Sequence, residues 1–258
     1  MNLIKEPKIA FCLFGGIGYK DKWPRSNEFL DPEICYKQYK YFNILKDNYD
    51  VFYHVWDNPY KDKIQNLYKP KKHICEPFKK FSVSTGSRSF SNWSRWYSTL
   101  KVNELKKEYE KENNIKYDYV FVTRFDIGFF TELNFKEYNP KYFWVGHDKN
   151  NLKKDKNYYS SRIPDYWFFS NSEKINNFSQ LFLNIEEYSK GGFDQHKTAK
   201  NMLDKLGYTN SIKYILNRDI DNALIRSVIN KKDVWNNKNL WNYDNNIYTL
   251  KPEIKNEL

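Results

Sequence analysis

The stretch Tyr117 to Phe130, YDYVFVTRFDIGFF, carries the residues best suited to chemistry. Its apolar run over residues 119–122 predicts a strand buried on both faces, and Thr123, Arg124 and Asp126 follow where that strand should end. Ligands of open α/β sheets bind just outside the carboxyl ends of strands. There the arginine could hold phosphate oxygens and the carboxylate could bind a divalent cation. A structural Arg–Asp salt bridge is the alternative, and spacing alone does not decide between them.

Glycines follow the first predicted strand of the chain. Residues Lys8 to Phe14 are predicted to form a buried strand, which ends at the sequence GGIG with Gly15 and Gly16 in front. Glycines after a first strand let backbone amides approach a ligand closely. The spacing does not fit the dinucleotide fingerprint GxGxxG, so a dinucleotide site has weak support and a plain turn is the alternative.

A second candidate group ends the next predicted strand, residues 49–56. Between the two strands a helix is predicted from Pro32, with Asp31 as its N-cap. The order of strand, glycine turn, helix and strand predicts the first half of a parallel α/β sheet, so Trp56 and Asp57 should lie at the same edge as the glycines. Trp56 could stack on a base, and Asp57 could accept hydrogen bonds from a ring N–H or a ribose. Core packing is the alternative for Trp56.

Residues 93–112 are predicted to form an amphipathic helix whose aromatic stripe is mostly core. A mobile, serine-rich loop over residues 82–91 is predicted to precede it. Ser94 and Arg95 then fall in the first turn, where unpaired amides favour anions. These two residues are therefore candidates for touching a ligand.

Two later carboxylates are candidates for a functional role. Asp165 lies in the predicted strand Ile163 to Ser170, in the sequence IPDYWFF. Asp194 lies in GGFDQH, where it is at once the predicted N-cap of a helix and a candidate functional carboxylate. Both residues fall in the second half of the chain.

Two other polar groups are assigned no function. The literal Asp-x-Asp of Asp219 and Asp221 precedes an apolar run, so capping of a helix over residues 222–229 explains it best. His147 and Asp148 end another predicted strand. A lysine-rich stretch that is typical of a flexible surface loop follows them.

The amino-acid composition indicates which kinds of partner the protein could bind. The chain has 258 residues, and 43 Lys and Arg against 32 Asp and Glu give a formal net charge of +11. This excess favours anionic partners such as nucleic acid, nucleotides or an anionic membrane surface. The lysines are spread along the chain, so a solvated basic surface is the alternative. Aromatic residues make up 19% of the chain, which excludes a disordered basic tail.

The cysteines and the apolar runs indicate a cytoplasmic protein. Cys12, Cys35 and Cys75 have no metal-ligand spacing, and their odd number points to a reducing compartment. No apolar run approaches the roughly 20 residues that span a bilayer. The N-terminus lacks the pattern of a signal peptide and is predicted to be a first strand.

The N-terminal strand with its glycines, FYHVWDN, SNWSRWYS, YDYVFVTRFDIGFF and GGFDQH together resemble bacterial and viral glycosyltransferases of the GT-A type. The resemblance covers approximately residues 8–226, and HVWD and YDYVFVTRFD are its most specific parts. It implies an α/β fold with a central mixed, mostly parallel sheet flanked by helices. A single GT-A-like domain over 1–230 would have a nucleotide-binding half, 1–125, and an acceptor half, 126–230. Residues 231–258 would form a tail that packs on the domain or contacts a partner.

The resemblance also implies a reaction. Such enzymes move a sugar from a nucleotide-sugar donor, here UDP by default, to a hydroxyl of a glycan or a lipid-linked acceptor. Peripheral contact with an anionic membrane, at the inner membrane surface, fits the basic charge, and no nucleic-acid partner is expected. In the family an Asp-x-Asp motif binds Mn²⁺ or Mg²⁺ on the diphosphate, and Asp126 matches its metal-binding aspartate. The first position is Arg124, which could itself neutralise the diphosphate, so metal dependence turns on this residue.

The resemblance assigns roles to the candidate residues. Asp194 is the expected base near the acceptor, and Asp165 is the competing position. The expected donor site comprises Phe14, Gly15, Gly16, Trp56, Asp57, Ser94, Arg95, Arg124 and Asp126. Two other functions stay open: a basic nucleic-acid-binding protein, for which no recognition motif is found, and a catalytically inactive nucleotide-sugar-binding module.

Overall fold

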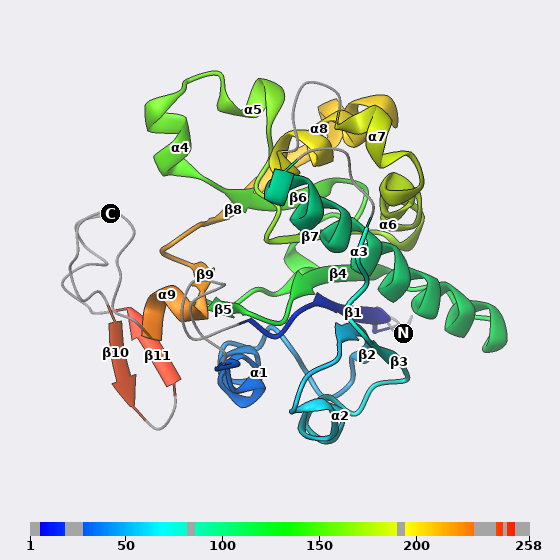
Figure 1. Ribbon diagram of the computed structural model, residues 1–258, viewed down its shortest axis with the longest axis vertical. Helices are drawn as coiled ribbons and strands as arrows, with labels where there is room; N and C mark the ends of the chain where they lie inside the picture. Colours follow the sequence, from blue (N-terminus) through cyan, green and yellow to red (C-terminus); the bar gives the residue numbers. More distant parts are fainter. Residues whose placement is uncertain are drawn as a thin grey trace, which may run out of the picture.

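A seven-stranded sheet forms the centre of the protein in the computed structural model (Figure 1). The structure describes residues 6–18, 28–81, 86–189, 194–229, 241–244 and 247–250. In spatial order the strands are β3 (Lys72–Glu76), β2 (Asp50–Trp56), β1 (Ile9–Gly15), β4 (Tyr119–Arg124), β7 (Trp167–Ser170), β6 (Phe143–His147) and β8 (Ile212–Asn217). All neighbours are parallel except β7, which runs antiparallel to both β4 and β6. The predicted α/β class with a mixed, mostly parallel sheet is confirmed.

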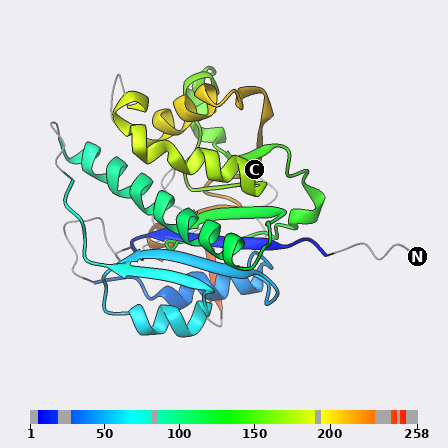
Figure 2. The same ribbon diagram turned by 90° about the vertical axis from the view of Figure 1, so that its right-hand side faces the viewer.

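Helices cover both faces of the sheet (Figure 2). One face carries α1 (Pro32–Tyr41) and α2 (Lys61–Tyr68). The other carries α3 (Gly86–Glu112), α6 (Ser172–Ser179), α7 (Ile185–Tyr188) and α8 (Gln195–Lys205). The short helices are α4 (Lys149–Lys154), α5 (Tyr158–Ser161) and α9 (Ile225–Ile229), with 3₁₀ turns η1 (Phe135–Glu137), η2 (Gln180–Asn184) and η3 (Thr209–Ser211).

The central strands are mostly apolar because the two helical layers bury both of their faces. In β1, Phe11 and Leu13 pack into the core beneath α1 and α2, whereas Cys12 and Phe14 pack into the core beneath α3. A strand buried in this way has no polar face, which explains why its sequence shows no alternation.

Two small antiparallel pairs complete the described structure. The first joins β5 (Ile127–Phe129) to β9 (Asn222–Leu224), and the second joins β10 (Trp241–Asp244) to β11 (Ile247–Leu250). Gln38 of α1 holds the second pair, because its side chain donates to the Tyr248 carbonyl and accepts from the Tyr248 N–H. The remainder of the predicted tail over 231–258 lies outside the described residues.

Three local predictions are wrong. Residues 86–91 belong to α3 and are not a loop, because the buried Asn92 and Trp96 anchor this end of the helix and override the weak propensity of its serines. The lysine-rich stretch after Asp148 forms α4 and α5 rather than a loop, and Asp148 caps α4 by accepting from the Asn151 N–H. Residues 222–224 form β9, so the helix expected there begins only at α9.

No helix in the described part of the chain is long and apolar enough to cross a membrane.

Gly128 of β5 offers a test of the packing between β5 and α9. A Cβ at Gly128 would collide with Cδ1 of Ile225, which lies in α9. We expect Gly128→Ala to lower the free energy of unfolding in urea by about 1–3 kcal/mol, the usual cost of overpacking. Adding Ile225→Val removes the colliding methyl group and should restore part of the loss.

Gly146→Ala is the matched control, because the nearest atom to a Cβ there lies 3.6 Å away. Equal destabilisation by the two glycine variants would contradict the tight contact between β5 and α9.

Candidate functional site

The carboxyl ends of β1 and β4 lie side by side at the centre of one sheet edge. Phe14 of β1 is paired with Arg124 of β4, so the turn at Gly15 and Gly16 lies beside the residues that follow β4. The chain leaves β1 toward β2 and β3 on one side, and α3 then carries it across to β4 on the other side. This reversal is a topological switch point, where α/β sheets open a crevice for ligands.

Strands from the second half of the chain bring further polar groups to the same edge. Because β7 is antiparallel to β4, with Trp167 opposite Thr123, the preceding Asp165 lies at the carboxyl end of β4. Strands β6 and β8 run parallel to each other and end at this edge with Asp148 and Arg218. The described edge therefore combines the predicted donor residues with carboxylates from later in the chain.

Arg124 and Asp126 form a two-pronged ion pair. Nε of Arg124 donates to Oδ1 of Asp126 at 2.8 Å, and Nη2 donates to Oδ2 at 2.7 Å. The Asp126 side chain is 2% exposed, whereas that of Arg124 is 25% exposed. Burial disfavours the charge on Arg124, but Asp126 outweighs this effect and raises the pKa of the guanidinium above its ordinary value. The salt bridge between Arg124 and Asp126, which the residue spacing could not decide, is therefore present. The arginine of this pair is still partly exposed at the surface.

The glycine turn lies directly against this pair. A Cβ at Gly18 would lie 2.9 Å from the Cβ of Asp126. Gly18 also has a φ of +87°, a backbone conformation that residues other than glycine rarely adopt. On the opposite side, the Tyr39 hydroxyl donates to the Arg124 carbonyl at 2.8 Å. The glycines thus allow the backbone after β1 to approach Asp126.

Arg95 is buried within the fold and does not lie at a helix terminus. Its Nε donates to Oδ2 of Asp165 at 3.0 Å, with side chains 4% and 2% exposed, and its guanidinium lies 4.0 Å from the ring centroid of Phe14. Burial lowers the pKa of Arg95 to about 10. Burial acts to raise the pKa of Asp165, but the charges of His196, Arg95 and Arg124 outweigh it and hold the value at about 2. The prediction of first-turn amides at this position is wrong, because α3 begins at Gly86.

Trp56 and Ser94 contact each other. The Trp56 indole N–H donates to Ser94 Oγ at 3.0 Å, and its ring stacks on Tyr97 with centroids 5.6 Å apart. Trp56 is only 6% exposed, so its described role is the core packing that was the alternative to base stacking. Asp57, the next residue, is exposed at the end of β2.

Asp194 caps α8, as the sequence predicts. Its Oδ1 accepts from the backbone N–H groups of His196 and Lys197, and its Oδ2 accepts from Nε of Arg162 at 2.8 Å. Burial opposes the negative charge, but Arg162, the neighbouring His196 and the backbone donors together lower the pKa of Asp194 below its ordinary value. The negative charge of its carboxylate is therefore already balanced by these donors, which makes the carboxylate a weak proton acceptor. Gly191, Gly192 and Phe193 of the same motif lie outside the described residues.

Sequence reasoning missed two members of the edge. Arg218 donates from Nη1 to Oδ2 of Asp148 at 3.0 Å, and its guanidinium lies 4.5 Å from the ring centroid of Tyr166. His196 lies with Nδ1 3.5 Å from Oδ1 of Asp165. Arg218 directly follows β8, so the strand-end rule that identified Asp126 could have found it.

Within the described residues, no cluster of side chains could hold a divalent metal ion by itself. In the ranges that the structure describes, no three His, Cys, Asp or Glu side chains are grouped closely enough to hold one. Asp126, the residue expected to bind Mn²⁺ or Mg²⁺, directs both carboxylate oxygens to Arg124. In this arrangement the positive charge beside Asp126 comes from the arginine.

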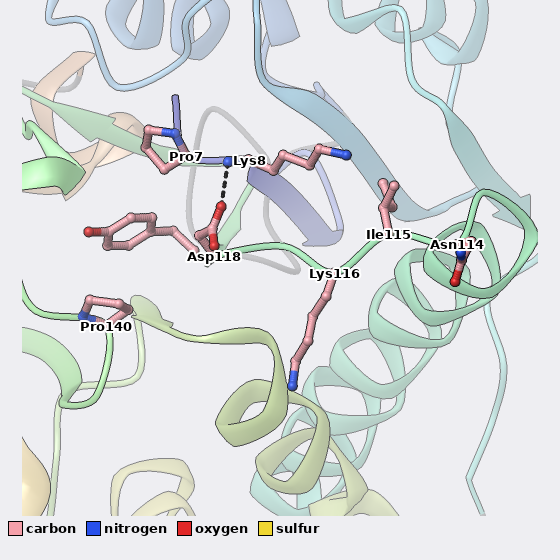
Figure 3. Close-up of a pocket in the computed structure, with 8 residues that line it drawn as sticks. Pro7, Lys8, Asn114, Ile115, Lys116, Asp118 and Pro140 are labelled. Carbon is pink, nitrogen blue, oxygen red and sulfur yellow. Dashed lines mark hydrogen bonds between the residues drawn. The ribbon is translucent and has the colours of Figure 1, made fainter. Parts of the chain in front are cut away.

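A hollow of about 530 Å³ lies at the opposite edge of the sheet (Figure 3). It is lined by residues just before β1, around the start of β4 and before β6: Pro7, Lys8, Asn114, Ile115, Lys116, Asp118, Tyr119 and Pro140. The backbone N–H of Lys8 donates to Asp118 there. Because this hollow is at the amino ends of β1 and β4, none of the predicted site residues lines it.

The described fold defines an α/β protein with a mixed, mostly parallel sheet flanked by helices. No protein-family model matches the chain, and no curated protein matches it significantly in sequence.

The Arg95–Asp165 pair predicts an acid-dependent stability. The folded pKa of about 2 for Asp165 lies below the ordinary value near 3.9, so its stabilisation is complete above that value and is lost as the pH falls toward 2. We expect Asp165→Asn to cost about 3–5 kcal/mol at pH 6, because it leaves Arg95 buried without a counter-charge. The difference from wild type should shrink by about 1–2 kcal/mol by pH 3 in denaturant titrations.

Asp62→Asn, on the exposed face of α2, is the control and should change stability little at either pH. A difference between Asp165→Asn and wild type that does not vary with pH would contradict the ionised pair.

Proposed function

We propose that this protein is a GT-A-type glycosyltransferase. It would move a sugar from a nucleoside-diphosphate donor, UDP by default, to a hydroxyl of a glycan or a lipid-linked acceptor. The mixed, mostly parallel sheet agrees with the fold that the sequence resemblance implies. The basic charge of +11 is compatible with both an anionic donor and peripheral contact with an anionic membrane.

The observation that carries the proposal is the close approach of the glycine turn, at Gly18, to Asp126, which pairs with Arg124 at the switch point. Backbone amides after β1 can approach a phosphate closely where glycines replace side chains. Arg124 lies across from them and is partly exposed. The two groups are the complementary halves of a diphosphate site, and they come from strands that are adjacent in space but distant in sequence.

Arg124 can bind phosphate while it remains paired with Asp126. A guanidinium has five N–H donors, and Asp126 uses one on Nε and one on Nη2. The remaining donors can contact phosphate oxygens in the planar geometry that arginine favours. In this proposal Asp126 is a positioning residue, and Arg124 stabilises the charge that develops on the departing nucleoside diphosphate.

The two other functions make different demands on the same edge. An inactive binding module would bind the donor without releasing its nucleoside diphosphate. A nucleic-acid-binding protein would need a concentrated basic surface. At the described edge, however, Arg95, Arg124, Arg162 and Arg218 each pair with an aspartate.

A panel of nucleotide-sugars tests the proposal. We expect one of the UDP-, GDP-, CMP- or dTDP-sugars to raise the melting temperature by several degrees at about 100 times its Kd, where binding contributes about 2.7 kcal/mol. Slow release of the nucleotide from the same donor would separate an enzyme from an inactive module. No stabilisation by any donor, together with salt-sensitive binding to random oligonucleotides, would contradict the proposal.

Variants of the ion pair test how the diphosphate is bound. If Asp126 acts only by positioning Arg124, then Arg124→Gln, Asp126→Asn and the double variant should weaken donor binding by a similar factor, roughly 10- to 100-fold. The factor should be the same with and without Mn²⁺. Donor affinity can be measured by calorimetry relative to each variant's own stability.

Lys8→Gln, at the opposite edge of the sheet, is the control and should leave donor affinity unchanged. The positioning role would be wrong if Mn²⁺ strengthened donor binding to wild type and Asp126→Asn alone abolished that gain.

A further inference from the structure

His196 has a fixed orientation at the start of α8. The ring is held from one side, because Nδ1 lies 2.9 Å from the carbonyl oxygen of Ile163 and 3.5 Å from Oδ1 of Asp165. The side chain is 25% exposed, whereas that of Asp165 is 2% exposed. Nδ1 therefore faces the protein interior, and Nε2 takes no part in these contacts.

The contact with Ile163 decides which nitrogen carries the proton. A carbonyl oxygen can only accept a hydrogen bond, so Nδ1 must be the donor. In the neutral imidazole Nε2 is then unprotonated and has a free lone pair. Nε2 forms no hydrogen bond with any residue in the described part of the chain, so this lone pair is available to accept a proton.

Asp165 lies beside Nδ1, the nitrogen of His196 that makes the contact with Ile163. Arg95 keeps this buried carboxylate ionised, and its oxygen lies close enough to Nδ1 to stabilise an imidazolium electrostatically. A carboxylate beside the inner nitrogen of a histidine base stabilises the protonated ring without taking the proton itself. Asp165 is thus a positioning residue for His196.

The neighbouring Asp194 is less suited to the same task. Two backbone N–H groups and Arg162 already occupy its oxygens. The charged side chains around His196 are Asp165 and Arg95 on its inner side, and Asp194 with Arg162 at the helix start. His196 is therefore better suited than Asp194, because its ring is oriented by Ile163 and its Nε2 accepts no hydrogen bond within the described residues.

We propose that His196, rather than Asp194, is the general base of the transfer reaction, an inference that rests on the proposed function. The acceptor hydroxyl gives its proton to Nε2 while its oxygen forms a bond to the anomeric carbon. The bond from that carbon to the diphosphate oxygen breaks, and its electron pair leaves with the nucleoside diphosphate, beside Arg124. Configuration at the anomeric carbon is inverted, because the attack is direct.

The kinetic test uses His196→Gln and the nucleotide-sugar that most stabilises the wild type. With water as acceptor, release of the nucleotide should fall at least about 100-fold, the usual contribution of general base catalysis. The donor-induced rise in melting temperature should stay unchanged, because the base does not hold the diphosphate. His73→Gln, at an exposed position of β3, is the matched control and should retain full activity. An active His196→Gln with an inactive Asp194→Asn would overturn the inference.

A second measurement does not depend on activity. In ¹⁵N-histidine NMR spectra, the signals of His196 are those that disappear in His196→Gln. In the neutral ring these signals should report a protonated Nδ1 and an unprotonated Nε2. A protonated Nε2 would overturn the assignment of His196 as base, even if the wild type transfers sugar. If the wild type neither binds nor cleaves any donor of the panel, the proposed function and the catalytic role both fail, and the NMR result then reports only the ring's structure.

Discussion

The buried ion pair between Arg95 and Asp165 is the interaction on which the arrangement of the sheet edge depends. Arg95 comes from α3, Asp165 precedes β7, and the guanidinium lies over Phe14 of β1. Neither charge could be buried without the other, because an unpaired buried ion costs several kcal/mol. The pair therefore fixes three elements relative to one another and, through Asp165, also sets the position of His196.

Because the charges along this edge are paired, the edge differs electrostatically from the chain as a whole. The chain carries a net charge of +11, yet the arginines of the described edge face aspartates at close range. Such pairs have little long-range field, because opposite charges at 3 Å largely cancel at a distance. The edge is therefore suited to orient a bound ligand through directed hydrogen bonds, and the lysines elsewhere account for the excess positive charge.

Much of the fold could be predicted because its central strands are buried on both faces. The runs in β1, β2 and β4 are apolar and β-branched or aromatic, and the caps Asp31 and Asp194 use local hydrogen bonds that short sequence patterns encode. The start of α3 could not be predicted, since Asn92 is held by Ser189 and Thr198, which lie about 100 residues away in the chain. The helix predicted after Asp221 failed for a similar reason, because pairing with β5 makes residues 222–224 a strand.

The sequence by itself determined which residues end the buried strands, and so placed Gly15, Gly16, Arg124 and Asp126 at one edge, because periodicity and burial are local properties. It left open whether Arg124 and Asp126 bind each other or a ligand. Only the tertiary structure decided the partners of the charged groups, since antiparallel β7 and the N-terminus of α8 bring Asp165 and His196 together from 31 positions apart. Long-range pairing sets the protonation and orientation of such side chains, and residue spacing does not encode it.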